Sequence, residues 1–404
     1  MSQFSNTTFT HQKVLLRVDY NVPLNSALEV TDDTRIRATM QTIAKILNDD
    51  GSVILMSHLG RPKDGPADKY SLKHIINHVA ELINDTTGQP TKVLFATDSV
   101  GEDAVEKANA LKPGEVLLLE NLRFYKEEEA GDVAFAKQLA ALGTMYVNDA
   151  FGTAHRAHAS TAVIAQFFAP THKMFGLLMQ AEVESASKVL HHTIKPFTAI
   201  IGGAKVSDKI LIIQNLLHTA TDIIIGGGMA YTFMKATGGT IGNSLCEHAM
   251  LDTATAILTK AAELGVCIHL PSDSTVGSKF AADAIISTAP SNAIPDGYMG
   301  LDIGPNAMEQ FSNVILQSKT ILWNGPMGVF EMQPFEHGTK AIAKAIAQAT
   351  TNGAYSLVGG GDSVAAVNQL GYTHQVSYIS TGGGALLEYF EGKELPGIAA
   401  ISQG

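Results

Sequence analysis

The six arginines of the chain are the residues whose type and placement most strongly predict chemistry. Arg17, Arg35, Arg37, Arg61, Arg123 and Arg156 all lie in the first 156 of the 404 residues. A guanidinium group is always charged and presents a rigid fork of donors, so it suits carboxylates and phosphates. Independent placement would produce this bias with a probability of roughly three in a thousand. The first part of the chain is therefore predicted to hold an anion with side chains.

Glycine clusters mark the second part of the chain instead. Apolar runs there end in two or three consecutive glycines, at residues 202–203, 226–228, 359–361 and 382–384. Such turns expose backbone N–H groups to phosphate. None of the triplets completes a G-x-G-x-x-G pattern, and the chain has no G-x-x-x-x-G-K-[ST] motif. These absences argue against a standard NAD enzyme or P-loop nucleotidase, and leave a different nucleotide or phosphate site open.

Two of the glycine clusters are followed by charged side chains. Lys205 and Lys209 come after the first cluster, and we expect this segment to open a helix, with both ammonium groups on one face beside an anion. A solvated helix face is the alternative. Asp362 and Ser363 follow the cluster at 359–361. Asp362 suits a magnesium ion that also binds phosphate, although an N-cap role fits either residue equally well.

Composition limits the class of protein. A chain of this length suggests two domains of about 200 residues each, and hence a cleft between them. The hydrophobic fraction of 45% and charged fraction of 17% are typical of a globular protein. The net charge of −11 argues against nucleic acid or an anionic membrane as the main partner.

The cysteines and the apolar runs of the chain indicate where in the cell the protein is expected to lie. Cys246 and Cys267 have no metal-site spacing, the first residues are polar, and no run of 18 apolar residues occurs. We expect a soluble, cytoplasmic protein with reduced thiols.

Short apolar runs alternate with helix-like stretches throughout the chain. This is the rhythm of doubly wound parallel sheets, so we expect two α/β domains joined by an amphipathic helix at residues 174–190. The expected helices of the first half span residues 37–48, 72–82 and 132–142. The expected strands span residues 14–18, 53–56, 93–95, 116–119 and 145–147 in the first half, and 198–201, 223–225, 266–270, 320–323, 355–358 and 376–379 in the second.

Ligands of doubly wound sheets bind beyond the carboxyl ends of the strands. In the first half these positions carry Arg61, Arg123 and Arg156, with His58, His155 and His158 close to them in the sequence. Taken singly, each histidine is more often structural than catalytic. Their clustering with arginines favours a site for a small phosphorylated carboxylic acid. Arg17 lies inside a strand run and is expected to be a structural ion-pair partner, and Arg37 is expected to face solvent.

Taken together, these segments closely resemble phosphoglycerate kinase, in the order of that family and over nearly the whole chain. The first half contributes RVDYNVPL at 17–24, SHLGRP at 57–62, ENLRF at 120–124 and NDAFGTAHRAH at 148–158. The second half contributes residues 202–209, GGGMA at 226–230, GLDIGP at 300–305, WNGPMGVFE at 323–331, GGGDS at 359–363 and STGGG at 380–384.

The resemblance implies two Rossmann-like domains and a domain division. Residues 1–172 would bind 3-phosphoglycerate or 1,3-bisphosphoglycerate, 173–195 would form the connecting helix and hinge, and 196–390 would bind ADP or ATP with magnesium. Residues 391–404 would return to the first domain. Because the two sites would lie on different domains, the lobes are expected to close for in-line phosphoryl transfer.

The resemblance also implies site residues. Arg35, Lys205 and Lys209 would clamp the migrating group, and Glu331 would accept from the ribose hydroxyls. Asp362 would meet Mg²⁺, and the loops at 226–228 and 300–305 would flank the adenine. The triose site would comprise Asp19, Tyr20, Asn21, Arg35, His58, Leu59, Gly60, Arg61, Arg123, His155 and Arg156. The nucleotide site would comprise Lys205, Lys209, Gly226, Gly300, Asn324, Glu331, Gly360, Gly361, Asp362 and Ser363.

Departures from the family pattern are few. Tyr20 stands where Phe is usual, Ser363 where Thr is usual, and Ser272 where an apolar residue is usual. The aromatic ring and the hydroxyl are retained, so the assignment stands. Family analogy implies a monomer. Two alternatives stay open, namely a kinase for another small acyl phosphate and a catalytically silent protein that binds phosphate ligands.

Overall fold

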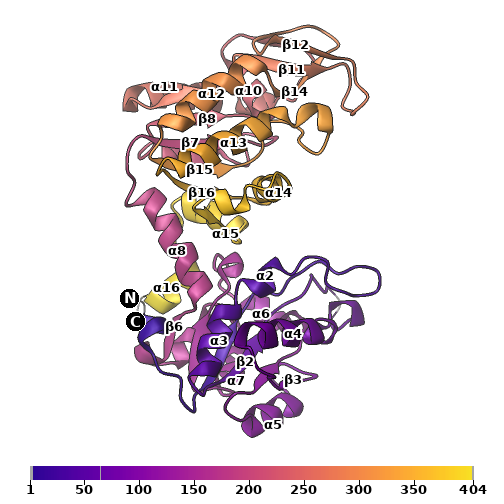
Figure 1. The fold of residues 1–404 in the computed structure, drawn as a ribbon, viewed down its shortest axis with the longest axis vertical. Coiled ribbons are helices and arrows are strands. Elements are labelled where there is room, and N and C mark those ends of the chain that lie inside the picture. The colour runs from indigo at the N-terminus through magenta and orange to yellow at the C-terminus, as the bar shows by residue number, and fades with distance from the viewer. Residues whose placement is uncertain (1–2, 64, 403–404) are drawn as a thin grey trace. The chain divides into compact units, whose positions relative to one another are not determined.

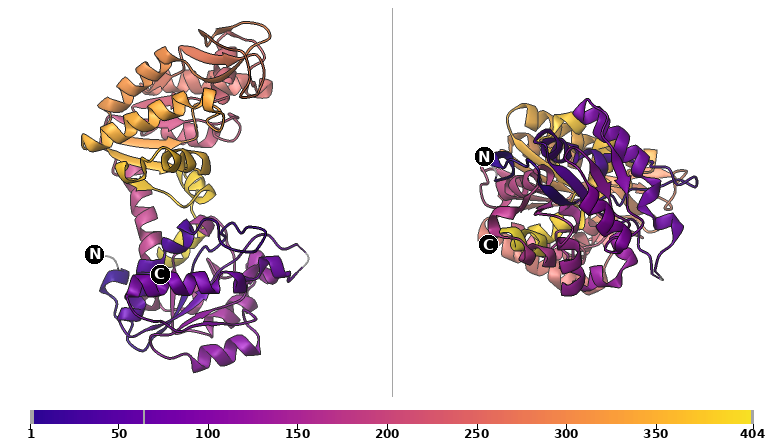
Figure 2. Two further views of the ribbon diagram at one scale, coloured as in Figure 1. Left: turned by 45° about the vertical axis from the view of Figure 1, so that its right-hand side comes forward. Right: turned by 90° about the horizontal axis from the view of Figure 1, so that it is seen from below.

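The computed structural model describes residues 3–63 and 65–402. The chain forms two compact units, one of residues 1–184 with 394–404 and one of residues 185–393. The boundary between them falls inside helix α8 (Leu177–Leu190), and the last helix, α16 (Pro396–Ser402), belongs to the first unit. Figures 1 and 2 show α16 in yellow, beside the strand β6 (Lys173–Phe175).

The first unit is built on a six-stranded parallel sheet. Its strand order is β3-β4-β2-β1-β5-β6, so the direction of winding reverses between β1 and β5. The first five strands are β1 (Lys13–Arg17), β2 (Ser52–Met56), β3 (Val93–Phe95), β4 (Val116–Leu118) and β5 (Met145–Asn148).

Alternating side chains of this sheet enter two separate cores. Leu16 and Leu55 pack with residues of α3 (Met40–Asn48) and α4 (Ile76–Thr87). Leu15 and Ile54 pack on the opposite side with residues of α5 (Glu102–Ala110) and α7 (Val133–Ala140). Burial on both faces explains why the strands are continuous apolar runs in the sequence. The short helices of this unit are α1 (Gln3–Asn6), α2 (Thr34–Arg37) and α6 (Lys126–Ala130).

The second unit repeats this plan. Its parallel sheet has the order β10-β8-β7-β15-β16-β17, with the reversal between β7 and β15. One face is covered by α12 (Pro305–Gln317), α13 (His337–Thr351) and α14 (Gly361–Gln369), around the buried Trp323. The strands are β7 (Phe197–Ile201), β8 (Asp222–Ile225), β10 (Cys267–His269), β15 (Thr320–Asn324), β16 (Tyr355–Gly359) and β17 (Tyr378–Ile379).

The second unit also contains two small sheets. One is antiparallel and has the order β12-β11-β14, and Figure 1 shows it apart from the main sheet. Its strands are β11 (Asp273–Gly277), β12 (Ile286–Pro290) and β14 (Met299–Ile303). The other pairs β9 (Thr240–Ile241) with β13 (Ala293–Ile294). The remaining helices are α9 (Ile210–Leu216), α10 (Met229–Ala236), α11 (Leu251–Leu264) and α15 (Gly384–Phe390).

The predicted fold class, two doubly wound parallel-sheet units, is confirmed. Two local expectations are wrong. The helix expected at 174–190 begins only at Leu177, because Met174 pairs within β6 against β5. The antiparallel sheet of β11, β12 and β14 was not expected. Its strands include polar residues, such as Ser274 and Thr288, where a buried parallel strand would be apolar.

Candidate active site

The residues after β1 form the centre of the candidate site in the first unit. Asp19 accepts a hydrogen bond from Nη1 of Arg35 at 2.8 Å, which is also an ion pair. Burial alone would raise the pKa of Asp19, but nearby positive charge, including Arg35 and Arg17, lowers it below its ordinary value. Arg35 is only half-buried. A fixed carboxylate therefore orients a partly exposed guanidinium group.

A loop after β2 is tied to the same centre. Gly60 donates its N–H to Oδ1 of Asn21 at 2.8 Å, and its carbonyl oxygen accepts from Nη1 of Arg123 at 3.0 Å. Arg123 also pairs with Glu129 at 3.1 Å. The buried Asn121 donates to the carbonyl oxygens of Leu59 and Tyr70, at 2.7 and 2.9 Å. The ends of β1, β2 and β4 thus hold one connected set of residues.

Two histidines near this centre are held neutral. Burial is the main cause that lowers the pKa of His58 to about 3, and nearby arginines, Arg17 among them, add to it. Burial likewise lowers the pKa of His158 to about 4, again with arginine charge contributing. Nη2 of Arg17 lies 3.3 Å from Nδ1 of His58. Because a guanidinium group can only donate, Nδ1 is the acceptor and Nε2 carries the proton.

Arg17 does not fill the role predicted for it. It is 1% exposed, but no carboxylate of the described residues forms an ion pair with it. Nε of Arg17 instead donates to the Ser160 hydroxyl at 2.8 Å, and that hydroxyl donates to Oε1 of Glu128 at 2.5 Å. A bridging serine thus replaces the expected direct pair. Arg37 is exposed and pairs with Asp33, in agreement with the expected solvent-facing position.

The predicted triose-site residues differ from one another in how far their side chains are exposed to solvent. Tyr20 is fully buried, and its hydroxyl pairs with Thr39 at 3.0 Å, so its ring belongs to the core. Leu59 is also buried and can offer only backbone atoms. Arg61 and Arg156 are exposed, and His155 is half-buried.

The second unit contains a pocket of about 310 Å³. Three predicted nucleotide residues line it: Gly300, Glu331 and Asp362. Gly300 donates its N–H to the Ser244 hydroxyl at 2.9 Å, which fixes one wall. The loops predicted to flank the adenine, 226–228 and 300–305, also contribute Gly227, Gly228, Leu301 and Asp302. The wall residues without a sequence prediction are Gly203, Ala204, Tyr231, Leu245, Phe280, Met299, Pro326, Met327, Gly328 and Val329. The pocket is thus mainly backbone and apolar surface, with three carboxyl groups at Asp302, Glu331 and Asp362.

Sequence reasoning missed the apolar walls, although a signal exists for two of them. Leu245 and Phe280 are 48% and 62% exposed and lie in loops, outside any helical or strand periodicity. Exposed large apolar side chains in loops are typical of ligand contacts. Asp302 falls within the segment 300–305 that the resemblance placed beside the adenine, but nothing in the sequence indicated its contact with Gly338.

Beside the pocket, the ends of three adjacent strands are joined by side chains. Nζ of Lys209 donates to Oδ1 of Asn324 at 2.6 Å, and Nδ2 of Asn324 donates to the Gly359 carbonyl oxygen at 2.8 Å. The buried Ser363 accepts from the Gly325 N–H at 2.6 Å. Asn324 and Ser363 thus organise the turns, while Gly360 and Gly361 present backbone at the start of α14. Gly226, also predicted, is buried directly after β8.

The expected placement of the two lysines on one helix face is wrong. The turns after β7 extend through residue 209, and α9 begins only at Ile210. Lys209 is half-buried, and burial lowers its pKa, whereas Lys205 is exposed. Only Lys209 is fixed by a side-chain partner, so the two ammonium groups are not equivalent.

Metal binding by side chains alone has no support among residues 3–63 and 65–402. No group of three or more His, Cys, Asp or Glu side chains there could hold an ion. Asp362 offers one exposed carboxylate in the first turn of α14. One carboxylate together with phosphate oxygens and water is a set that Mg²⁺ accepts, so the site fits a metal that arrives with a nucleotide.

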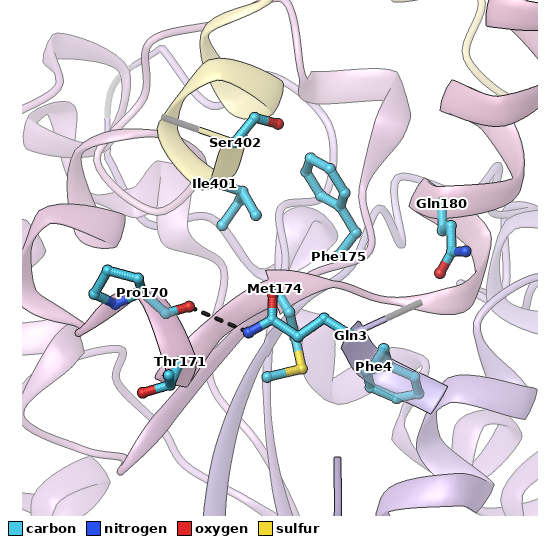
Figure 3. A pocket seen from close by; sticks show the side chains of 9 residues that line it. All are labelled: Gln3, Phe4, Pro170, Thr171, Met174, Phe175, Gln180, Ile401 and Ser402. Carbon is cyan, nitrogen blue, oxygen red and sulfur yellow. Dashed lines mark hydrogen bonds between the residues drawn. The ribbon is translucent and has the colours of Figure 1, made fainter. Parts of the chain in front are cut away.

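A second hollow lies in the first unit, bordered by α1, β6, α8 and α16 (Figure 3). Its volume is about 420 Å³. Its walls are Gln3, Phe4, Pro170, Thr171, Met174, Phe175, Gln180, Ile401 and Ser402, none of which is charged. A hollow without Lys, Arg or His gives an anionic substrate no positively charged partner, so it is not the candidate site.

Comparisons with known proteins point to one family. A family model described as phosphoglycerate kinase matches residues 4–393. The phosphoglycerate kinase of Porphyromonas gingivalis is 54% identical, over 97% of this chain and 98% of its own. A cytosolic phosphoglycerate kinase of Arabidopsis thaliana is 49% identical, over 97% and 96%. The solved structure of the Coxiella burnetii enzyme has a TM-score of 0.88 at 39% identity, with 99% and 98% covered. No helix of the described residues has the length and apolar character that crossing a bilayer requires.

Proposed function

The chain belongs to the phosphoglycerate kinase family, and from that premise we propose how its residues divide the reaction between two substrates. It is a phosphotransferase with a carboxyl group as acceptor, and it transfers a phosphoryl group reversibly between 1,3-bisphosphoglycerate and ADP. Such a transfer needs no protein nucleophile, because the attacking and leaving oxygens both belong to the substrates. Catalysis is then positioning together with charge stabilisation.

The first unit would hold the triose. Arg35, Arg61, Arg123 and Arg156 supply the charge that its phosphate and carboxylate groups require. His58 and His155 would add donors, and Asp19 and Asn21 would set the positions of Arg35 and the Gly60 loop. Because His58 is neutral with its proton on Nε2, it can donate one hydrogen bond to the triose. Tyr20 and Leu59 would contribute through backbone or packing only.

The second unit would hold ADP or ATP. The apolar walls, with Gly226 and Gly300 nearby, suit an adenine ring, and the Glu331 carboxylate suits the ribose hydroxyls. The N–H groups at Gly360 and Gly361 suit phosphate oxygens at the start of α14. Lys209, held by Asn324, would neutralise charge on the migrating group, with exposed Lys205 as a weaker contributor.

Magnesium would enter with the nucleotide, and Asp362 would be its protein ligand. The ion would supply charge neutralisation on the phosphate oxygens. Asp362 is exposed in the first turn of α14 and needs no change in the fold to reach it. The residues of the chain bind and orient both substrates, and the two units must bring the bound substrates together in each turnover.

The assignment of one substrate to each unit rests on one observation. Arg35, Arg61, Arg123 and Arg156 all belong to one unit, and the backbone-lined pocket lies in the other. We further propose that the protein works as a cytoplasmic monomer. The Arabidopsis and wheat relatives are described as cytosolic, and a sedimentation measurement at micromolar protein would test the oligomeric state.

Paired binding titrations test the division. Arg61→Ala should weaken binding of 3-phosphoglycerate and leave ADP binding intact. Glu331→Ala should weaken ADP binding and leave 3-phosphoglycerate binding intact. A variant that weakened the binding of both ligands equally would contradict the assignment of one substrate to each unit. Turnover with acetate or aspartate in place of 3-phosphoglycerate would favour the alternative acyl-phosphate kinase, and no turnover with any acceptor would favour a silent binding protein.

A further inference from the structure

We propose that Asp302 is a positioning residue for the nucleotide, because at the wall of the second unit's pocket it bonds the far end of segment 328–338, which carries Glu331, and packs closely against the near end. The inference rests on the proposed role of Glu331 as the acceptor of ribose hydroxyls. Asp302 itself is assigned no contact with a substrate.

Asp302 lies at the boundary between the pocket and the protein interior. It belongs to β14, it is 2% exposed, and it lines the pocket together with Glu331. No lysine, arginine or histidine among the described residues forms an ion pair with it. A buried carboxyl group without a cation is costly, so its retention calls for a function in the fold or the site.

At the far end of the segment, Asp302 caps a helix. Oδ2 accepts a hydrogen bond from the N–H of Gly338 at 2.7 Å, in the first turn of α13. Glu336, the N-cap residue of α13, forms no capping bond with its own side chain. The first turn of a helix leaves N–H groups without partners. A residue from a neighbouring strand therefore supplies the missing cap.

At the near end, the same carboxyl group fills the space beside Gly328. A Cβ atom on Gly328 would lie 2.3 Å from Oδ1 of Asp302, and one on Gly338 would lie 2.2 Å from it. The next N–H, that of Val329, donates to the Leu301 carbonyl oxygen at 2.8 Å. Both ends of the segment thus close on two consecutive residues of β14.

The pKa of Asp302 is set by its burial and by the groups that lie closest to it. Burial raises the pKa of Asp302 to about 7, opposed by the N–H groups of Gly338 and Ile303 and assisted by the charge of Glu336. Tyr231, which also lines the pocket, is the other titratable group that senses Asp302. Both oxygens of the carboxyl group are therefore committed to backbone.

The chain offers a matched control in Asp273. This residue is 6% exposed, lies in β11 of the same small sheet, and caps α12 by accepting from Asn306 and Ala307 at 3.2 and 2.8 Å. A glycine, Gly304, also presses on it, with a Cβ position 2.3 Å from its carboxyl carbon. Asp273 does not line the pocket. Its substitution removes a cap of the same kind away from the nucleotide.

Steady-state kinetics on the full-length enzyme test the proposal. Asp302→Asn should raise the KM for ADP roughly tenfold, the scale of losing a hydrogen bond to a charged group, and leave the KM for the triose substrate unchanged. Asp273→Asn should change neither KM. Gly338→Ala, a change at a residue that does not itself line the pocket, would displace the Asp302 carboxyl group and should reproduce the effect if the Asp302 variant folds poorly. An unchanged KM for ADP, or equal changes for both substrates, would overturn the proposal.

A double-mutant cycle separates this inference from the role of Glu331. Glu331→Ala alone should raise the KM for ADP, and a null result there contradicts the proposed function. If Asp302 acts through Glu331, adding Asp302→Asn to Glu331→Ala should raise the KM for ADP by less than twofold more. Fully multiplicative effects would overturn the positioning role even when Glu331 itself is needed.

Discussion

Lys209 and Asn324 are joined by a hydrogen bond from Nζ to Oδ1 of 2.6 Å. The bond connects the turn after β7 to the end of β15, at the point where the winding of the second sheet reverses. Ligands of doubly wound sheets bind at such points. Burial lowers the pKa of Lys209, and Asn324, the partner that holds the lysine in place, carries no charge. Its positive charge stays available to a phosphoryl group.

Lys209→Met should lower kcat by roughly two to three orders of magnitude, the scale of losing a preorganised charge stabiliser. The matched variant Lys205→Met should have a much smaller effect, because Lys205 is exposed. The check is kcat in a coupled assay with both substrates saturating. Equal losses in the two variants would contradict the distinction drawn between them.

Gly60→Ala should raise the KM for 3-phosphoglycerate by roughly tenfold, because the loop that Arg123 and Asn21 hold would move. Gly60 has a φ of +64°, and a Cβ atom there would lie 2.4 Å from the Tyr70 ring. Gly88 has a φ of +70° with open space around it. Gly88→Ala therefore shares the backbone strain without the collision. An equal change of KM in both variants would show that loop position is not the cause.

His58 should stay neutral down to about pH 4, with its proton on Nε2. Its pKa is lowered to about 3, mainly by burial. Neutral histidine stabilises the fold above the unfolded pKa of about 6.5, and this contribution is lost as the pH falls through the folded value. Nitrogen-15 NMR shifts of the imidazole ring report both the charge and the tautomer. A protonated Nδ1 at pH 7 would contradict the acceptor role opposite Arg17.

Asp149→Asn should gain stability relative to the wild type as the pH rises from 5 to 7. Burial raises the pKa of Asp149 to about 7, although Oδ1 accepts from the Met179 N–H at 2.9 Å at the start of α8. The native state then binds more protons than the unfolded state over this range, so wild-type stability falls as the pH rises. The slope should approach about 1.4 kcal/mol per pH unit.

Denaturant unfolding of both proteins at several pH values measures this difference. The asparagine variant cannot titrate at this position, and its own pH dependence serves as the baseline. A difference in unfolding free energy that stays constant from pH 5 to 7 would mean that Asp149 is ionised throughout.

Apolar runs buried on both faces made the strands of the two main sheets readable from the sequence. Residues such as Leu15 and Leu16 face different cores, so the run has no polar alternation. The strand ends then indicated the arginine positions and the glycine turns. The residue pattern could not reveal contacts between distant segments, such as Asp302 with Gly338 or Arg17 with Ser160. Those depend on tertiary packing that local periodicity does not encode.

The most direct test of the account is the kcat of Arg35→Ala with 3-phosphoglycerate and magnesium ATP in a coupled assay. The structure gives Arg35 one fixed ion pair, to Asp19, and leaves its guanidinium group half-buried. If Arg35 clamps the migrating phosphoryl group, kcat should fall by roughly three orders of magnitude, the scale of losing an arginine finger. An intact kcat with only a raised KM for 3-phosphoglycerate would contradict that role.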